Sequence, residues 1–266
     1  MNWRKFSSIL LLSILSHQVN SQNILDDYKH SDSLSRYYEY KDLEKSMDYQ
    51  LKALALAVEI NDKSLLFEAM TNYAGLLSET GQFEESVKKW EETFTYAQNR
   101  GDSALIYKGI AIPYLDKGDT DLALKNLLKA LELVEDDDQL RIRILTELGF
   151  AHRGIHEYEK ALDYFKQIVT LKKKLGINNY YREHMNIGLA YLDFDLYDSA
   201  IHHFNLSYDG MDKENEVYGI GLYYTNMGCA LTDSKRFEEA LPYSKKAVIY
   251  KEKLGNPTRL ANSYNL

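Results

Sequence analysis

Residues 148–165 read LGFAHRGIHEYEKALDYF, and two later stretches place the same kinds of residue at the same spacing. Residues 187–204 read IGLAYLDFDLYDSAIHHF, and residues 227–244 read MGCALTDSKRFEEALPYS. Each stretch has a glycine at its second place, an aromatic residue at its eleventh and an alanine at its fourteenth. Six such stretches align along the chain at intervals of 37 to 40 residues. A fixed period of this size indicates a repeat protein, in which each unit is one supersecondary element.

Within each repeat, apolar residues recur at three- and four-residue steps on both sides of a short turn, which predicts two amphipathic helices. Small residues are expected where these two helices approach closely. Position 8 of the repeat carries Leu34, Ala74, Ala111, Gly149, Gly188 and Gly228, and position 20 carries Ser46, Ser86, Ala123, Ala161, Ala200 and Ala240. Larger residues at positions 17 and 24 fill the space beside them. Gly81 and Gly118 mark the turn between the helices, where a positive φ is often needed.

This pattern resembles the tetratricopeptide repeat, with its L-G-x-x-Y and A-x-x-x-F signature. The resemblance covers about residues 27–266, and it is strongest in the last three full units and weakest in the first. It implies an all-α fold, a right-handed superhelical α-solenoid of antiparallel helix pairs. Two features depart from the family. The units are longer than the usual length of about 34 residues, and none has the proline that usually ends the second helix.

The period predicts the organisation of the chain. We expect a signal peptide at residues 1–21 and a repeat array at residues 22–266. The array divides into units at about residues 27–66, 67–103, 104–141, 142–180, 181–220 and 221–259, with an incomplete seventh at residues 260–266. Because that seventh unit stops inside a first helix, we expect the natural protein to continue beyond Leu266.

The first 21 residues differ in composition from the repeats. Arg4 and Lys5 precede an apolar stretch from Phe6 to Leu15, and small residues follow at positions 19–21. This three-part pattern is typical of a secretory signal peptide. The apolar stretch is too short to span a bilayer of roughly 30 Å. We therefore predict export to the periplasm or the extracytoplasmic face of the membrane; the alternative is a buried hydrophobic first helix.

The composition argues against several classes of function. The formal net charge is −8 and the isoelectric point is about 5.4, whereas nucleic-acid-binding domains are usually basic. The single cysteine, Cys229, cannot form an intramolecular disulfide. The sequence has no glycine-rich phosphate loop and no nucleophile with an identifiable base. We predict that the protein is not an enzyme and has no cofactor.

Histidines give only a weak signal for a metal. His152 and His156 are four residues apart, a spacing that can hold a metal on a helix. They occupy a core position and the turn of the repeat, and no third ligand is evident. His202 and His203 are adjacent and therefore point in different directions on a helix. We predict no metal site.

The resemblance also implies where a ligand would bind. In the family, the first helices line the concave groove, and position 6 points into it. That position carries Asn72, Asn186 and Asn226, whose amides suit the backbone of an extended peptide. Lys108, Arg143 and Arg182 are nearby in the repeat and could receive a carboxylate. The alternatives are asparagines that satisfy neighbouring helices and solvated basic side chains.

A signal peptide before such repeats resembles the amino-terminal sensory region of bacterial membrane-bound regulators. We therefore predict a protein- or peptide-binding scaffold that forms the sensory or interaction region of an exported or membrane-bound bacterial signalling protein, with its ligand in the groove. The membrane would be contacted only through a segment beyond the carboxyl end of this sequence. The alternatives are a free periplasmic assembly scaffold and, with no residue in its favour, a hydrolase with a cryptic site.

Overall fold

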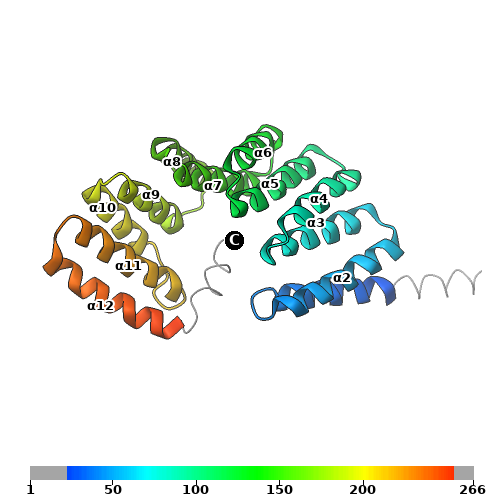
Figure 1. The fold of residues 1–266 in the computed structure, drawn as a ribbon, viewed down its shortest axis with the longest axis horizontal. Helices are drawn as coiled ribbons and strands as arrows, with labels where there is room; N and C mark the ends of the chain where they lie inside the picture. Colours follow the sequence, from blue (N-terminus) through cyan, green and yellow to red (C-terminus); the bar gives the residue numbers. More distant parts are fainter. Residues whose placement is uncertain (1–22, 255–266) are drawn as a thin grey trace, which may run out of the picture. The chain divides into compact units, whose positions relative to one another are not determined.

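The computed structural model describes residues 23–254, and every regular element in this range is helical. The helices follow one another as antiparallel pairs (Figure 1). The pairs are residues 23–38 with α2 (Leu43–Ile60), α3 (Lys63–Glu79) with α4 (Phe83–Thr93) and the short 3-10 helix η1 (Phe94–Tyr96), α7 (Asp138–Gly154) with α8 (Tyr158–Lys174), α9 (Tyr181–Asp193) with α10 (Tyr197–Asp209), and α11 (Val217–Asp233) with α12 (Phe237–Leu254). Between these pairs, α5 (Arg100–Lys117) packs against α4, and α6 (Thr120–Leu133) packs against α7. The predicted all-α solenoid of helix pairs is confirmed. The predicted signal peptide and incomplete seventh repeat lie outside the described residues.

The chain divides into two compact units. Unit 1 extends to Lys117, and unit 2 begins at Gly118. Within each unit, successive helices pack against one another, and neighbouring first helices also touch, as α3 touches α5 and α9 touches α11. Because each helix is covered only by its neighbours, stability is expected to be local to adjacent repeats.

First helices begin earlier than the sequence motif alone indicates. Among the five first helices from α3 to α11, four start four residues before the boundary chosen from the repeat, and only α9 starts at it. This added turn lacks the small residues that define the repeat, so the period does not reveal it. Two of these helices are capped by aspartates, since Asp62 accepts hydrogen bonds from the backbone N–H groups at the start of α3 and Asp137 does so for α7.

The turn after the first helix has a left-handed residue at the same position in every repeat from the second to the sixth. Gly81 and Gly118 have φ values of 76° and 87°, as expected for glycines at the end of a first helix. His156, Asp195 and Lys235 occupy the corresponding position in the last three repeats and have φ values of 63°, 57° and 63°. The turn therefore keeps its geometry where the glycine is lost, at a steric cost to these larger residues.

The repeat's small and large positions form the contact between the two helices of a pair. Gly188 of α9 faces Phe204 of α10, and Phe204 is completely buried. A Cβ atom on Gly188 would lie only 2.5 Å from Cε1 of Phe204. In the last pair Ser244 replaces this phenylalanine, and the nearest atom to a Cβ on Gly228 would be its Oγ, at 3.0 Å. The glycine at position 8 is thus required most where the aromatic ring is present.

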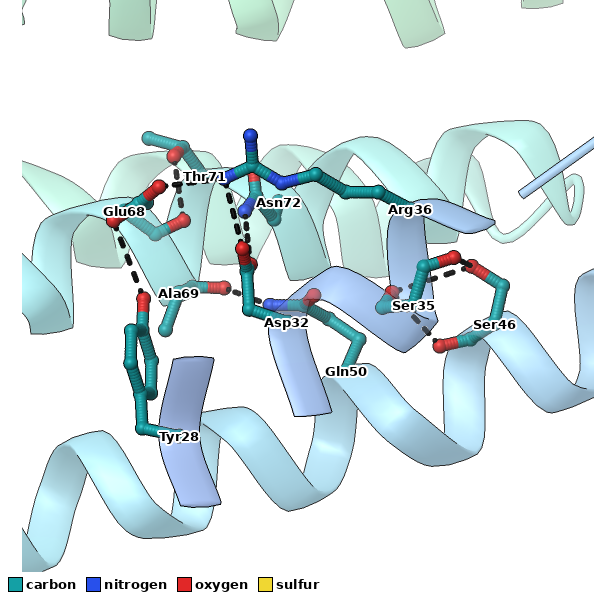
Figure 2. A network of polar contacts seen from close by, with 10 residues as sticks. All are labelled: Tyr28, Asp32, Ser35, Arg36, Ser46, Gln50, Glu68, Ala69, Thr71 and Asn72. Carbon is teal, nitrogen blue, oxygen red and sulfur yellow. Dashed lines mark hydrogen bonds and ion pairs between the residues drawn. The ribbon is translucent and has the colours of Figure 1, made fainter. Parts of the chain in front are cut away.

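The first repeat replaces this apolar contact with hydrogen bonds. Ser35 and Ser46 exchange bonds from each hydroxyl to the other's backbone carbonyl, at 3.0 and 2.8 Å (Figure 2). Gln50, at the position of the phenylalanine, is fully buried and donates from Nε2 to the carbonyl of Ala69 at 3.0 Å. These bonds satisfy polar groups that would otherwise be costly to bury.

Candidate functional site

Side chains about one repeat apart meet on neighbouring first helices. Asn72 contacts Asp32, Arg153 forms an ion pair with Asp193, and Asn226 contacts Met185. These pairs are separated by 40 or 41 residues. The first helices of one unit therefore lie side by side, and equivalent positions form rows across them.

In unit 1, Asn72 belongs to an internal polar network. Its Nδ2 donates to Oδ1 of Asp32 at 3.0 Å, and Arg36 bridges Asp32 and Glu68 at 2.9 and 2.6 Å (Figure 2). The Tyr28 hydroxyl donates to Glu68 at 3.4 Å. Burial raises the pKa of Asp32, and the charge of Arg36 opposes that shift. The amide of Asn72 thus has a carboxylate partner that supports the packing of two helices.

In unit 2, the amides of the two remaining asparagines make fewer or weaker hydrogen bonds within the protein. Asn186 of α9 is half-buried and has no hydrogen-bond partner within residues 23–254. Asn226 of α11 is also half-buried, and its Nδ2 approaches the sulfur of Met185 at 3.3 Å. A thioether is a weak acceptor. Both amides therefore retain donors and an acceptor for another molecule.

Apolar and sulfur-containing side chains form the next row on the same side of unit 2. Phe150, Leu189 and Cys229 each follow the position-6 residue of their helix by three, so they project from the same face. Phe150 and Leu189 are half-buried, and Cys229 is exposed. We call the side of α7, α9 and α11 that carries this row and the asparagines the first-helix face.

The three basic residues predicted from sequence differ in their surroundings. Arg143 of α7 is exposed on unit 2. Arg182 of α9 donates from Nε to the Tyr181 hydroxyl at 3.0 Å and lies over the tyrosine ring. Lys108 is half-buried on α5, in unit 1. The structure thus places two of the three basic residues on the unit that carries Asn186 and Asn226.

The histidines singled out from sequence have internal roles. His152 is buried, with Nδ1 2.6 Å from a carboxylate oxygen of Glu157, and it stacks on Tyr164. His156 occupies the left-handed turn. Across the described part of the chain, no set of three or more His, Cys, Asp or Glu side chains could hold a metal ion. None of the helices described is both long enough and apolar enough to cross a membrane.

Sequence reasoning missed two polar pairs in unit 2. Lys172 and Glu183 form an ion pair at 2.6 Å in which both side chains are largely buried. His184 and His203 bring their Nδ1 atoms to 3.1 Å. The partners come from consecutive helices and are 11 and 19 residues apart. Because the partners lie on different helices, the periodicity within one helix does not join them.

Two segments of the chain match sequence profiles of known families. Residues 102–174 and residues 222–256 each match a profile described as tetratricopeptide repeat. No curated protein sequence matches the chain. These segments confirm the expected repeat type in the middle and the last part of the array.

Solved structures share the fold at low sequence identity. BtubC (BKLC) from P. vanneervenii superimposes with a TM-score of 0.69 at 16% identity, covering 81% of this chain and 93% of that one. A tetratricopeptide repeat protein from Parabacteroides merdae gives 0.59 at 15% identity, with coverages of 85% and 80%. The kinesin light chain-like repeats of Podosopora anserina give 0.58 at 13% identity, with coverages of 70% and 95%.

The class of protein follows from the helix pairs and the matched segments. The chain contains tetratricopeptide repeats, and its fold is a tetratricopeptide-like solenoid. Scaffolds of this class generally serve protein–protein interaction through the extended surfaces that stacked repeats create, and they are typically not enzymes.

Proposed function

We propose that the first-helix face of unit 2 binds an extended segment of a partner protein. The observation that carries the proposal is the pair Asn186 and Asn226 on neighbouring first helices, with amides that the protein itself uses little. An asparagine amide can donate to a backbone carbonyl and accept from a backbone N–H of the same peptide. Two such residues one repeat apart would hold a peptide in an extended form.

The surroundings of these asparagines suit a partner with mixed side chains. Leu189 and Phe150 offer partly exposed apolar contact beside them, and Arg143 and Arg182 add positive charge one helical turn before the asparagine row. Peptide main-chain bonds would then supply affinity, and the neighbouring rows would supply preference for particular side chains. Asn72 is a weaker candidate for peptide binding because its amide already donates a hydrogen bond to Asp32.

The binding proposal is tested with peptides selected from a random library against the whole chain. We expect the double variant Asn186→Ala/Asn226→Ala to bind the selected peptides about tenfold more weakly, because each lost hydrogen bond is worth about 0.5–1.5 kcal/mol. The matched control is Asn126→Ala, which removes an asparagine from the second helix α6, where its Nδ2 donates to the Leu122 carbonyl. An unchanged affinity in the double variant, with helicity intact, would reject the proposal.

The proposal includes export of the chain, which rests on the signal-like residues Arg4 to Ser21. Expression in a bacterial host should yield a mature protein that begins at Gln22 and fractionates with the cell envelope. A chain that keeps its first residues and remains in the cytoplasm would contradict this part.

A sensory role within a membrane-bound signalling protein is the finer proposal, and a free periplasmic scaffold is its alternative. The two differ in the reading frame beyond Leu266. An apolar span of about 20 residues followed by an output domain supports the sensor, and a stop codon after one further helix supports the scaffold.

A further inference from the structure

Two histidines face each other between α9 and α10. His184 and His203 have their Nδ1 atoms 3.1 Å apart, and their ring centroids are 5.2 Å apart with planes tilted by 38°. Both side chains are half-buried. They come from the two helices of one repeat, so their separation is fixed by the packing of that pair.

The helix backbone holds both rings in place. His203 precedes the fully buried Phe204, and His184 stands beside the buried Met185. The packed core therefore fixes the backbone of both histidines, and the Tyr191 ring lies against His203 with the centroids 5.4 Å apart. A pair of ligands on packed helices is preorganised, which favours binding of an ion over rearrangement.

Protonation chemistry keeps the two rings neutral near neutral pH. Burial lowers the pKa of both histidines, and for His203 the pKa falls to about 4 with further contributions from His184, His202 and Lys166. The negative charge of Glu183 raises the pKa of His184, and the positive charge of Lys173 lowers it further. In the hydrogen bond between the two Nδ1 atoms, one ring carries its proton on Nδ1. When both rings carry their proton on Nε2 instead, both Nδ1 lone pairs are available as ligands.

The distance between the two nitrogens fits one shared metal ion. Nitrogen ligands of zinc lie about 2.0–2.1 Å from the ion, so two of them are separated by about 2.9 Å at a right angle and about 3.4 Å at a tetrahedral angle. The observed 3.1 Å falls between these limits. The separation of the two Nδ1 atoms therefore matches that of two ligands of one ion.

We propose that His184 and His203 together bind a transition-metal ion of the Zn²⁺, Ni²⁺ or Cu²⁺ type through their Nδ1 atoms, with solvent at the remaining positions. Imidazole nitrogen suits these ions better than it suits magnesium or calcium. Only two protein ligands contribute, since no larger set exists among residues 23–254. Lys166 and Lys173 add positive charge nearby. The site is accordingly weaker than a three- or four-ligand site.

Thermal denaturation of the untagged whole chain, with and without added Zn²⁺ or Ni²⁺, tests the proposal. An ion that binds only the folded state raises the melting temperature. We expect a rise of about 2 °C or more in the unchanged protein. The rise should be absent in His184→Gln and in His203→Gln. It should persist in the matched control His202→Gln, which removes the exposed neighbour on α10.

A second measurement separates binding from stability. Proton NMR of the histidine rings should show the signals of His184 and His203 shifting together as Zn²⁺ is added, while the signal of His156 stays unchanged. Three results would each overturn the proposal: no ion effect on the unchanged protein, an effect that survives both glutamine variants, or an effect abolished by His202→Gln alone.

Discussion

The variant Gly188→Ala adds one methyl group at a close contact between the two helices of a repeat. Gly188 lies on α9 opposite Phe204 of α10, and the added Cβ would lie 2.5 Å from Cε1 of that ring. Carbon atoms in favourable contact are separated by about 3.5–4.0 Å. Because Phe204 is completely buried, the ring cannot turn into solvent, so the two helices must separate or the ring must leave its preferred rotamer.

The change in the free energy of unfolding caused by Gly188→Ala is the difference between two opposing effects. Insertion of a methyl group into a packed core costs about 1–3 kcal/mol. Replacement of glycine by alanine inside a helix gains about 0.5–1 kcal/mol. We therefore expect Gly188→Ala to lower the free energy of unfolding by about 1–2 kcal/mol. This would be visible as a shift of the urea midpoint in circular dichroism.

Gly228→Ala is the matched control, at the same repeat position on α11. The nearest atom to its Cβ would be the Oγ of Ser244, at 3.0 Å, and this small side chain can rotate; the Ser244 backbone nitrogen lies at an ordinary contact distance of 3.6 Å. Here the gain in helix propensity should dominate, leaving stability unchanged or up to about 1 kcal/mol higher. If Gly188→Ala is as stable as the unchanged protein, or if both variants lose the same amount, the aromatic contact does not explain the glycine.

Three further changes are predicted. Lys235→Gly should stabilise the protein by about 0.5–1 kcal/mol in urea denaturation, because glycine adopts the left-handed conformation of this residue without a steric cost. An unchanged urea midpoint would contradict this. Lowering the pH from about 6.5 to about 4 should reduce the free energy of unfolding, since burial lowers the pKa of His203 to about 4 and the unfolded chain takes up the proton first; His203→Gln should flatten this part of the pH profile. Lys172→Met should cost about 3–5 kcal/mol, because it leaves the buried Glu183 without its partner; a melting temperature within a degree of the unchanged protein would count against this.

Most of the fold could be predicted from the repeat period. Spacing alone located the small residues at Ala161 and Ala200, and both are fully buried in the structure. It also located the left-handed turn through Gly81 and Gly118. These features are periodic because the two helices of each repeat approach one another and connect in the same way. The added first turn of most first helices was missed, because it has no residue type in common between repeats, although Leu66, Leu140 and Ile220 in these turns are buried.

The site could be predicted only in part. The register of the repeat places Asn186 and Asn226 on one side of α9 and α11. It does not reveal that Asn72 has a carboxylate partner and Asn186 has none among the described residues, because that depends on the residue across the helix contact. Asp32 lies 40 residues before Asn72, close to one period. Comparison of residues one period apart could therefore have suggested this pair.

Cys229 makes the first-helix face directly observable. It is the chain's single cysteine and is exposed on α11, three residues beyond Asn226. A fluorophore or spin label attached there would report on one defined place with no background substitutions. Partial burial and the nearby Asp233 raise the pKa of the thiol, so labelling should be faster in mildly alkaline buffer. A bound partner would then be detected as slowed labelling or a changed spectrum, even before its identity is known.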